Sequence, residues 1–334
     1  MLENKFDFGI HGSTIIETFY DGNLQPVRVP PNCVLDLSSI QSSNRRLFEP
    51  ITNFLDEVKR RGKNSFYIQR TFALGDMLML IPVVRHLRTL GFDPWIRTSS
   101  LFKDILKVFD IQIEFTTDRQ DTNEFGISLD GTIERDHYNA VLSRMHRVHI
   151  YLEALGVKEM PKEVDWSCDL SWFPEVEVGD GEYIALQEGG STQAKRLTEE
   201  TINYIHKALE GKKVKVIATG NAVGRIAPTP LHLFTLIAKA KCLISMDSAP
   251  LWISHFTKTP VIAILGPSRP EERLTLHPLY PEGAVGIELN KEIGCDACFE
   301  HAEKCNSSFS CLKVPPKRIC ELLLPKVMRF WRGE

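Results

Sequence analysis

The chain has 334 residues, enough for two domains of ordinary size or one large one. Its 43% hydrophobic and 25% charged residues are typical of a globular protein with a substantial core. The net charge of −3, with dispersed lysines and arginines, argues against a general nucleic-acid-binding protein. No apolar run is long enough to span a bilayer and no signal-peptide pattern opens the chain, so we expect a cytoplasmic protein. In that reducing compartment the eight cysteines are expected as thiols or metal ligands.

Residues 1–62 form a predicted N-terminal extension. The stretch STIIETFYDGNLQPVRV predicts two strands around an Asp21-Gly22 turn, a β-hairpin element. The sequence assigns this extension no role.

A first domain is predicted over residues 63–165, where short apolar runs alternate with amphipathic helical runs. Strands are expected at 65–70, 94–98, 111–115 and 124–130, and helices after Asp76, around 101–109 and over 137–155. This alternation indicates βαβ units and a parallel, Rossmann-like sheet.

A second domain is predicted over residues 166–314, after a segment at 158–182 that is rich in Pro and acidic residues and reads as a linker. Strands are expected at 183–187, 213–218, 242–246 and 260–265, with helices at 197–209 and 231–240. Residues 315–334 predict a terminal helix that returns to pack on the first domain. Two such sheets should form a cleft, with ligands at the carboxyl ends of their strands.

One carboxylate, Asp76, lies between the first predicted strand of the first domain and the apolar helix in GDMLMLIPVVRHLR. Asp76 follows Gly75 directly and would serve as an N-cap for a helix beginning near Met77. A carboxylate at a helix N-terminus also stays ionised, so Asp76 can instead act as a base that takes a proton from an attacking hydroxyl. The two interpretations do not exclude each other.

The loop QEGGSTQAKRLTEE follows the first strand of the second domain. Gly189 and Gly190 precede a helix that Thr198 would cap, and such a loop offers backbone N–H groups to an anion. Lys195 and Arg196 add positive charge. The loop matches neither a Walker sequence nor GxGxxG, and an ordinary glycine turn with surface cations is the alternative.

A third loop, ISMDSAPLWISHF, ends a strand at Asp247 and Ser248, and Pro250 suits the first turn of the next helix. Phosphate or ribose oxygens can bind at that helix N-terminus, although a plain Asp-Ser cap would also explain the residues. AILGPSRPEERL supplies a Gly-Pro turn at the following strand end.

In order and approximate spacing, these segments resemble glycosyltransferase family 9, the heptosyltransferase family, from about Ser65 to the C-terminus. The resemblance implies an α/β GT-B fold, with two Rossmann-like domains facing across a cleft: an acceptor domain over 63–165 and a nucleotide-sugar-binding domain over 166–314. It also implies an inverting, metal-independent transfer of a heptose-type or hexose sugar from a nucleoside-diphosphate sugar to an acceptor hydroxyl.

By position, the resemblance makes Asp76 the catalytic base and places Lys195 on the diphosphate. The residues expected at the nucleotide sugar are Gly75, Gly189, Gly190, Ser191, Lys195, Thr219, Asp247, Ser248, Ala249 and Pro250. The chain departs from the family pattern at Ala249, where a glycine is usual, at Trp252, where a histidine is frequent, and at Glu188. These departures leave the identity of the sugar open.

Four cysteines lie within 17 residues, in CDACFEHAEKCNSSFSC. The spacing of Cys295, Cys298, Cys305 and Cys311 is that of a metal site, with Zn or Fe bound by sulfur. A site closed by four thiolates would stabilise the fold rather than catalyse. Free thiols are the alternative, and His301 is placed to replace one ligand. The resemblance supports a metal, since a protein-glycosylating subgroup of the family carries one there.

Two other functions fit part of the sequence: a nucleotide-sugar epimerase on the same fold, and a non-enzymatic nucleic-acid-binding protein with a structural metal. The acceptor, whether glycan, protein or nucleic acid, and the oligomeric state are left open. Basic stretches at 59–63 and 135–149 would face an anionic acceptor, or are solvated helix faces.

Overall fold

The computed structural model describes residues 6–7, 14–20, 23–29, 54–70, 73–99, 102–115, 125–129, 145–189, 195–219, 229–298, 305 and 310–333. The chain divides into two compact units. Unit 1 comprises 1–72, 80–140 and 147–164, and unit 2 comprises 73–79, 141–146 and 165–334. The last change of unit, between 164 and 165, falls beside the predicted domain boundary.

An antiparallel sheet near the N-terminus contains β1 (Phe6–Asp7), β2 (Thr14–Tyr20) and β3 (Asn23–Val29), in that order. Tyr20 pairs with Asn23, so β2 and β3 form the predicted hairpin. The two expected turn residues lie outside the described residues.

The sheet of unit 1 is parallel and contains β4 (Ser65–Gln69), β5 (Asp93–Thr98), β6 (Ile113–Phe115) and β7 (Gly126–Ser128). Its strand order is β6-β5-β4-β7. Every residue of β4 after Ser65 is buried, as expected of a strand covered on both faces. The four predicted strands are therefore confirmed.

In the described part of the chain, the helices that accompany this sheet are α1 (Phe54–Arg60), α2 (Leu74–Thr89), α3 (Lys103–Lys107) and α5 (Arg147–Leu155). The pattern of the sequence did not predict α1, which Phe54 fixes by ring contacts with Phe66 and Phe125 at 5.0 and 5.4 Å. The helix expected over 137–155 is described only from Arg147 onward.

The predicted linker is irregular in the structure apart from one 3-10 turn, η3 (Leu170–Trp172), which Asp169 caps through the N–H of Ser171. Trp166 anchors its start, because the buried indole N–H donates to the Leu276 carbonyl at 2.8 Å. The sequence of this segment lacks a helical period, and the structure has no α-helix there.

The sheet of unit 2 is also parallel, with β8 (Ile184–Leu186), β9 (Val216–Ala218), β10 (Cys242–Ser245), β11 (Val261–Leu265) and β12 (Ala284–Glu288). The strand order is β12-β11-β10-β8-β9. Strands β8 to β11 are the predicted ones. The sequence pattern did not predict β12, because Gly286 interrupts its apolar run.

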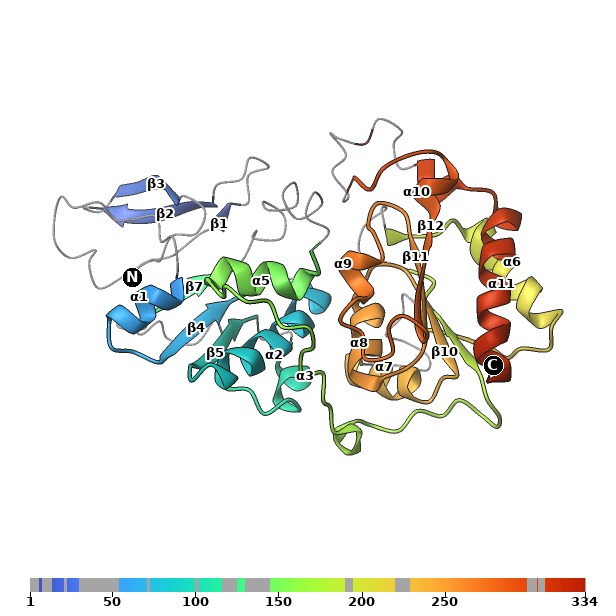
Figure 1. Ribbon diagram of the computed structural model, residues 1–334, viewed down its shortest axis with the longest axis horizontal. Helices are drawn as coiled ribbons and strands as arrows, with labels where there is room; N and C mark the ends of the chain where they lie inside the picture. The colour runs from blue at the N-terminus through green and yellow to red at the C-terminus, as the bar shows by residue number, and fades with distance from the viewer. Residues whose placement is uncertain are drawn as a thin grey trace. The chain divides into compact units, whose positions relative to one another are not determined.

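Helices cover both faces of this sheet (Figure 1). On one face α6 (Glu199–Glu210) lies alongside α11 (Pro316–Arg332), and on the other lie α7 (Pro230–Ala238) and α8 (Ala249–Thr257). Short helices α9 (Glu271–Leu274), α10 (Leu289–Glu292) and η5 (Ser310–Lys313) complete the unit. In the described part of the chain, no helix combines the length and apolar character that crossing a bilayer requires.

The expectation that the terminal helix packs on the first domain is wrong, because α11 contacts α6, β10 and β11 within unit 2. Ile319, Leu323 and Val327 recur every four residues and are buried in the core of this unit. Phe330 and Trp331 are half-buried and pack against the same core.

Candidate active site

The polar loops predicted from the sequence gather at one edge of the unit 2 sheet. Because β8, β9, β10 and β11 are parallel neighbours, their carboxyl ends lie on the same side. Gln187–Gly189 follow β8, Thr219 follows β9, Met246–Ser248 follow β10, and Gly266–Ser268 follow β11. The fold thus brings the second and third predicted loops together.

A buried glutamine fastens two of these strand ends. The side-chain oxygen of Gln187, Oε1, accepts hydrogen bonds from Ser245 Oγ at 2.5 Å and from the Met246 N–H at 2.9 Å. The side-chain nitrogen, Nε2, donates to the Gly189 carbonyl. The loop after β8 is therefore fixed to the loop that carries Asp247. The sequence reasoning missed Gln187, whose one signal was a polar residue closing the apolar run YIALQ.

The predicted phosphate loop is described at both ends. Gly189 is buried, Lys195 is half-buried and Arg196 is exposed, whereas Gly190 and Ser191 lie outside the described residues. Thr198 caps α6 by accepting from the Thr201 N–H at 3.2 Å, as predicted. His206 on the same helix pairs with Glu188 at 2.9 Å, so α6 is tied to the loop at two points.

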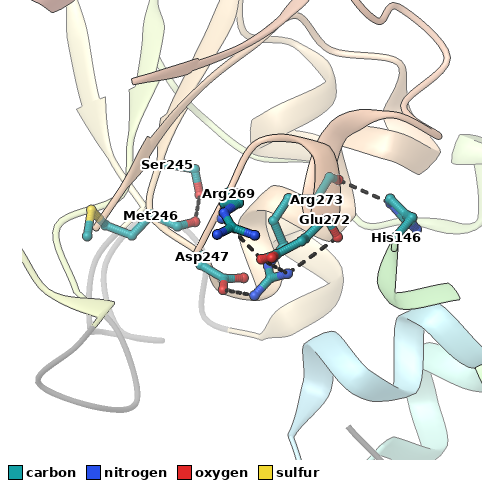
Figure 2. Close-up of polar contacts among 7 residues, drawn as sticks. All are labelled: His146, Ser245, Met246, Asp247, Arg269, Glu272 and Arg273. Carbon is teal, nitrogen blue, oxygen red and sulfur yellow. Dashed lines mark hydrogen bonds and ion pairs between the residues drawn. The ribbon is translucent and has the colours of Figure 1, made fainter. Parts of the chain in front are cut away.

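Asp247 lies in a buried ionic cluster, drawn in Figure 2. The fully buried Arg273 donates from Nη2 to Asp247 Oδ2 at 2.6 Å, and its Nη1 lies 3.5 Å from Glu272 Oε2. That same Glu272 oxygen accepts from the Arg269 N–H at 3.1 Å. The sequence did not identify Arg273, because three consecutive charged residues after Pro270 give no sign of burial.

Helix α8 begins directly after Asp247. Ser248 occupies the N-cap position with extended backbone, but its side chain makes no capping hydrogen bond. Ala249 and Pro250 form the first turn, where proline was predicted. The Asp-Ser cap interpretation is wrong, since the Asp247 carboxylate pairs with Arg273 instead.

Three buried hydroxyls stand at this edge of the sheet without a hydrogen-bond partner among the described residues: Thr219 Oγ1, Ser248 Oγ and Ser268 Oγ. They follow β9, β10 and β11, three strands of the same parallel sheet. A buried hydroxyl left unpaired costs about 1–3 kcal/mol. A polar ligand bound at the strand ends would remove that cost.

The start of α2 corrects the interpretation of Asp76 as an N-cap. Ala73 adopts a left-handed backbone with φ of 63°, and its carbonyl accepts from the Met77 N–H at 3.1 Å. The helix therefore begins at Leu74, and Asp76 is its third residue, half-buried in the first turn. In this position the helix dipole still favours a carboxylate.

The first turns of α2 and α8 are in contact. A Cβ added to Gly75 would lie 2.8 Å from Trp252 Cδ1, 3.2 Å from Trp252 Nε1 and 3.7 Å from Ala249 Cα. Residues 73–79 belong to unit 2 for this reason. The predicted base is consequently in the same compact unit as the predicted donor residues Asp247 and Ser248.

Buried aromatic and imidazole rings surround Trp252. The rings of His146 and His255 have their centroids 5.6 and 5.2 Å from it. His146 Nε2 and His255 Nε2 lie 3.3 and 3.0 Å from the Arg273 carbonyl, which connects this cluster to the Asp247 ion pair. Burial lowers the pKa of His255 to about 4, so this ring is neutral near pH 7.

The four clustered cysteines are not in disulfides. Cys295, Cys298 and Cys305 are half-buried and Cys311 is buried. Burial, with a smaller effect from Cys305 and Cys295, raises the pKa of Cys311 to about 11. Among the described residues no group of three or more ligating side chains is arranged for a metal ion.

The chain has two separate parallel sheets, each accompanied by helices. This arrangement defines a protein of the GT-B fold class. No protein-family model and no curated protein sequence matches the chain. Its likeness is to solved structures of glycosyltransferases.

One such structure is the iron-containing dodecameric glycosyltransferase TibC from enterotoxigenic E. coli H10407, at 15% identity and a TM-score of 0.57, covering 96% of this chain and 83% of TibC. The heptosyltransferase TibC in complex with ADP-D-β-D-heptose gives 16% identity and a TM-score of 0.58, covering 96% of this chain and 84% of the other. A family 9 glycosyl transferase from Veillonella parvula DSM 2008 is 14% identical, with a TM-score of 0.53. The match covers 80% of this chain and 97% of the other.

Proposed function

We propose that the protein is an inverting glycosyltransferase that takes a sugar from a nucleoside-diphosphate sugar to an acceptor hydroxyl. The observation that carries this proposal is the contact between the first turns of α2 and α8, at Gly75 and Ala249. The half-buried Asp76 directly follows Gly75, and α8 begins at the edge of the sheet where Thr219, Ser248 and Ser268 have buried hydroxyls without a described partner, which supports Asp76 as the base. The GT-B fold shared with TibC supports the same assignment.

In the proposed reaction the Asp76 carboxylate takes the proton of the acceptor hydroxyl. The acceptor oxygen forms a bond to the anomeric carbon while the bond from that carbon to the phosphate oxygen breaks. The nucleoside diphosphate leaves with the electron pair, and the configuration at the anomeric carbon inverts. Lys195 and the N–H groups of the loop after β8 would stabilise the charge that grows on the leaving phosphate.

We assign Gly189, Gly190, Ser191, Lys195, Thr219, Asp247, Ser248, Ala249 and Pro250 to the donor site. Arg273 fixes the Asp247 carboxylate by an ion pair of 2.6 Å, and Gln187 fixes the adjoining loop. A donor bound here would meet loops whose positions are set before binding, which lowers the entropic cost of binding.

We also propose that Cys295, Cys298, Cys305 and Cys311 hold a structural Zn or Fe. Thiolate sulfur suits both metals, and the C-x2-C pair has metal-site spacing. The Cys311 sulfur lies 3.0 Å from a Cβ added to Gly266, so Cys311 packs beside the turn that follows β11. The neighbour TibC is iron-containing, which supports the assignment. The metal would stabilise the fold and take no part in transfer.

The donor is tested by thermal unfolding with a panel of nucleoside diphosphates and their sugars, ADP-heptose included. A ligand present at 100 times its Kd stabilises the protein by about 2.7 kcal/mol and raises Tm. The selected donor is then incubated with and without acceptor glycans, proteins and nucleic acids. Epimerisation of the donor sugar in the absence of any acceptor indicates an epimerase. A protein whose Tm is raised by no compound of the panel contradicts the proposal.

The base is tested by Asp76→Asn, which keeps the size of the side chain and removes its basicity. Loss of a general base typically lowers turnover by about 10² to 10⁴-fold, while nucleoside diphosphate binding should persist. Asp104→Asn, an exposed aspartate in the first turn of α3, is the matched control. Near-normal turnover by Asp76→Asn would remove Asp76 from this role.

A further inference from the structure

The first turn of α2 is held in an unusual backbone conformation. Ala73, just before the helix, has a φ of 63°, in the left-handed region that residues with a Cβ rarely adopt. Such strain persists only where surrounding packing imposes it, and it is frequent at functional sites. The structure must therefore contain a contact that fixes this turn.

That contact is the indole of Trp252. The position of a Cβ on Gly75 is 2.8 Å from Trp252 Cδ1, closer than side chains approach one another, so only glycine fits. The indole is 2% exposed and has little room to withdraw. Besides Gly75, the ring has the rings of His146 and His255 as neighbours, with centroids 5.6 and 5.2 Å away.

The same side chain belongs to the first turn of α8, three residues after Ala249. Trp252 therefore touches the residue directly before Asp76 and is built into the helix that follows Asp247 and Ser248. An aromatic ring packed rigidly between two helix starts fixes their separation, because interiors are packed as densely as crystals.

We propose that Trp252 is a positioning residue for the base Asp76: it sets the distance between that carboxylate and the donor loop at the start of α8. This role rests on the proposed function. In this role Trp252 does not contact substrate, and it acts by holding the backbone of Gly75 in place.

The test is a double-mutant cycle of Gly75→Ala and Trp252→Leu. In Gly75→Ala the new methyl group collides with the indole and displaces Asp76, and misplacement by about 1 Å costs roughly 10²-fold in kcat. Trp252→Leu removes the collision, so the double variant should recover about tenfold of that loss. Donor KM and nucleoside diphosphate affinity should change little in Gly75→Ala, because the donor loops keep their own contacts.

Gly211→Ala is the matched control, since an added Cβ there meets only carbonyl oxygens at 3.4 and 3.7 Å. Trp252→Phe, which keeps an aromatic ring, should retain more kcat than Trp252→Leu. A merely structural role would change Tm without separating kcat from KM.

Additive effects of the two substitutions on kcat, or an unchanged kcat in Gly75→Ala, overturn the positioning role while leaving the proposed function intact. A wild-type protein that cleaves or transfers no donor overturns the proposed function, and the positioning role with it.

Discussion

Arg273 shows how much a single side chain contributes to this site. Its guanidinium is fully buried and joins Asp247 and Glu272, while its carbonyl lies within hydrogen-bonding distance of two histidines. Nothing in the local sequence indicates burial, because the partner Asp247 lies 26 residues away. Asp76, Lys195 and Asp247 could be selected from the sequence, since each stands at a predicted strand end. Arg273 could not, since only the tertiary fold brings it to Asp247.

Replacing Arg273 with Met should destabilise the protein strongly. The change leaves the carboxylates of Asp247 and Glu272 buried without the cation, and such a loss costs about 3–5 kcal/mol. The free energy of unfolding in urea measures it. Arg318→Met, which breaks an exposed ion pair with Glu292, should destabilise the protein far less, because solvent screens that pair. Equal effects of the two changes would contradict the role of the buried pair.

Stability should fall on mild acidification because of His255. Its pKa is about 4 in the folded protein against an ordinary 6.5, so the unfolded chain binds the proton first as the pH falls below 6.5. The loss should reach about 2 kcal/mol at pH 5 and level off below pH 4, where the folded ring is also protonated.

Burial lowers the pKa of the neighbouring His277 as well, which adds to the loss in the same direction. Urea unfolding of the wild type and of His255→Gln, from pH 8 to pH 5, separates the contribution of His255. The variant should lose less stability between pH 7 and pH 5, while the difference between the two proteins stays constant above pH 7. Parallel curves throughout would contradict the assignment.

At the scale of elements, long apolar runs made the strands predictable and short or interrupted ones did not. The runs of β8, β10 and β11 are buried throughout, whereas Gly286 breaks β12. The start of α2 was predicted three residues late, because the left-handed backbone of Ala73 begins the helix and no residue type signals it. The terminal helix was predicted, but not its packing on α6.

Gln187 connects β8 to β10, so Gln187→Met should affect both strand ends. The substitution leaves the Met246 N–H and the Ser245 hydroxyl without that acceptor in a buried site, a loss of about 1–3 kcal/mol. We expect weaker nucleoside diphosphate binding together with lower stability, measured by calorimetry and urea unfolding. The control Gln112→Met, at an exposed glutamine, should change stability by no more than about 0.5 kcal/mol.

At the scale of the whole molecule, the proposed base and every proposed donor residue fall in unit 2. The proposed acceptor domain corresponds to unit 1, whose sheet contributes none of these residues. The sequence predicted both sheets. It did not predict that 73–79 and 141–146 join the second unit, since the contacts of Gly75 and His146 with Trp252 form only in the tertiary fold.

Hydrogen exchange should therefore respond unevenly to the nucleotide. Nucleoside diphosphate binding should slow amide exchange at 183–189, 216–219 and 245–253, where β8, β9 and β10 end, because bound ligand suppresses local opening. The amides of β4 and β5 should exchange as before. Protection confined to β4 and β5 would place the nucleotide on the wrong sheet for our proposal.

The chain changes unit five times, at 72/73, 79/80, 140/141, 146/147 and 164/165. Recombination at the linker alone would consequently produce a defective hybrid. A transplanted segment 165–334 would contain Trp252 and Arg273 but not Gly75 and His146. It would therefore lose the contact of Trp252 with Gly75 and that of the Arg273 carbonyl with His146. Exchange of unit 2 between proteins of this fold therefore requires three pieces of sequence rather than one.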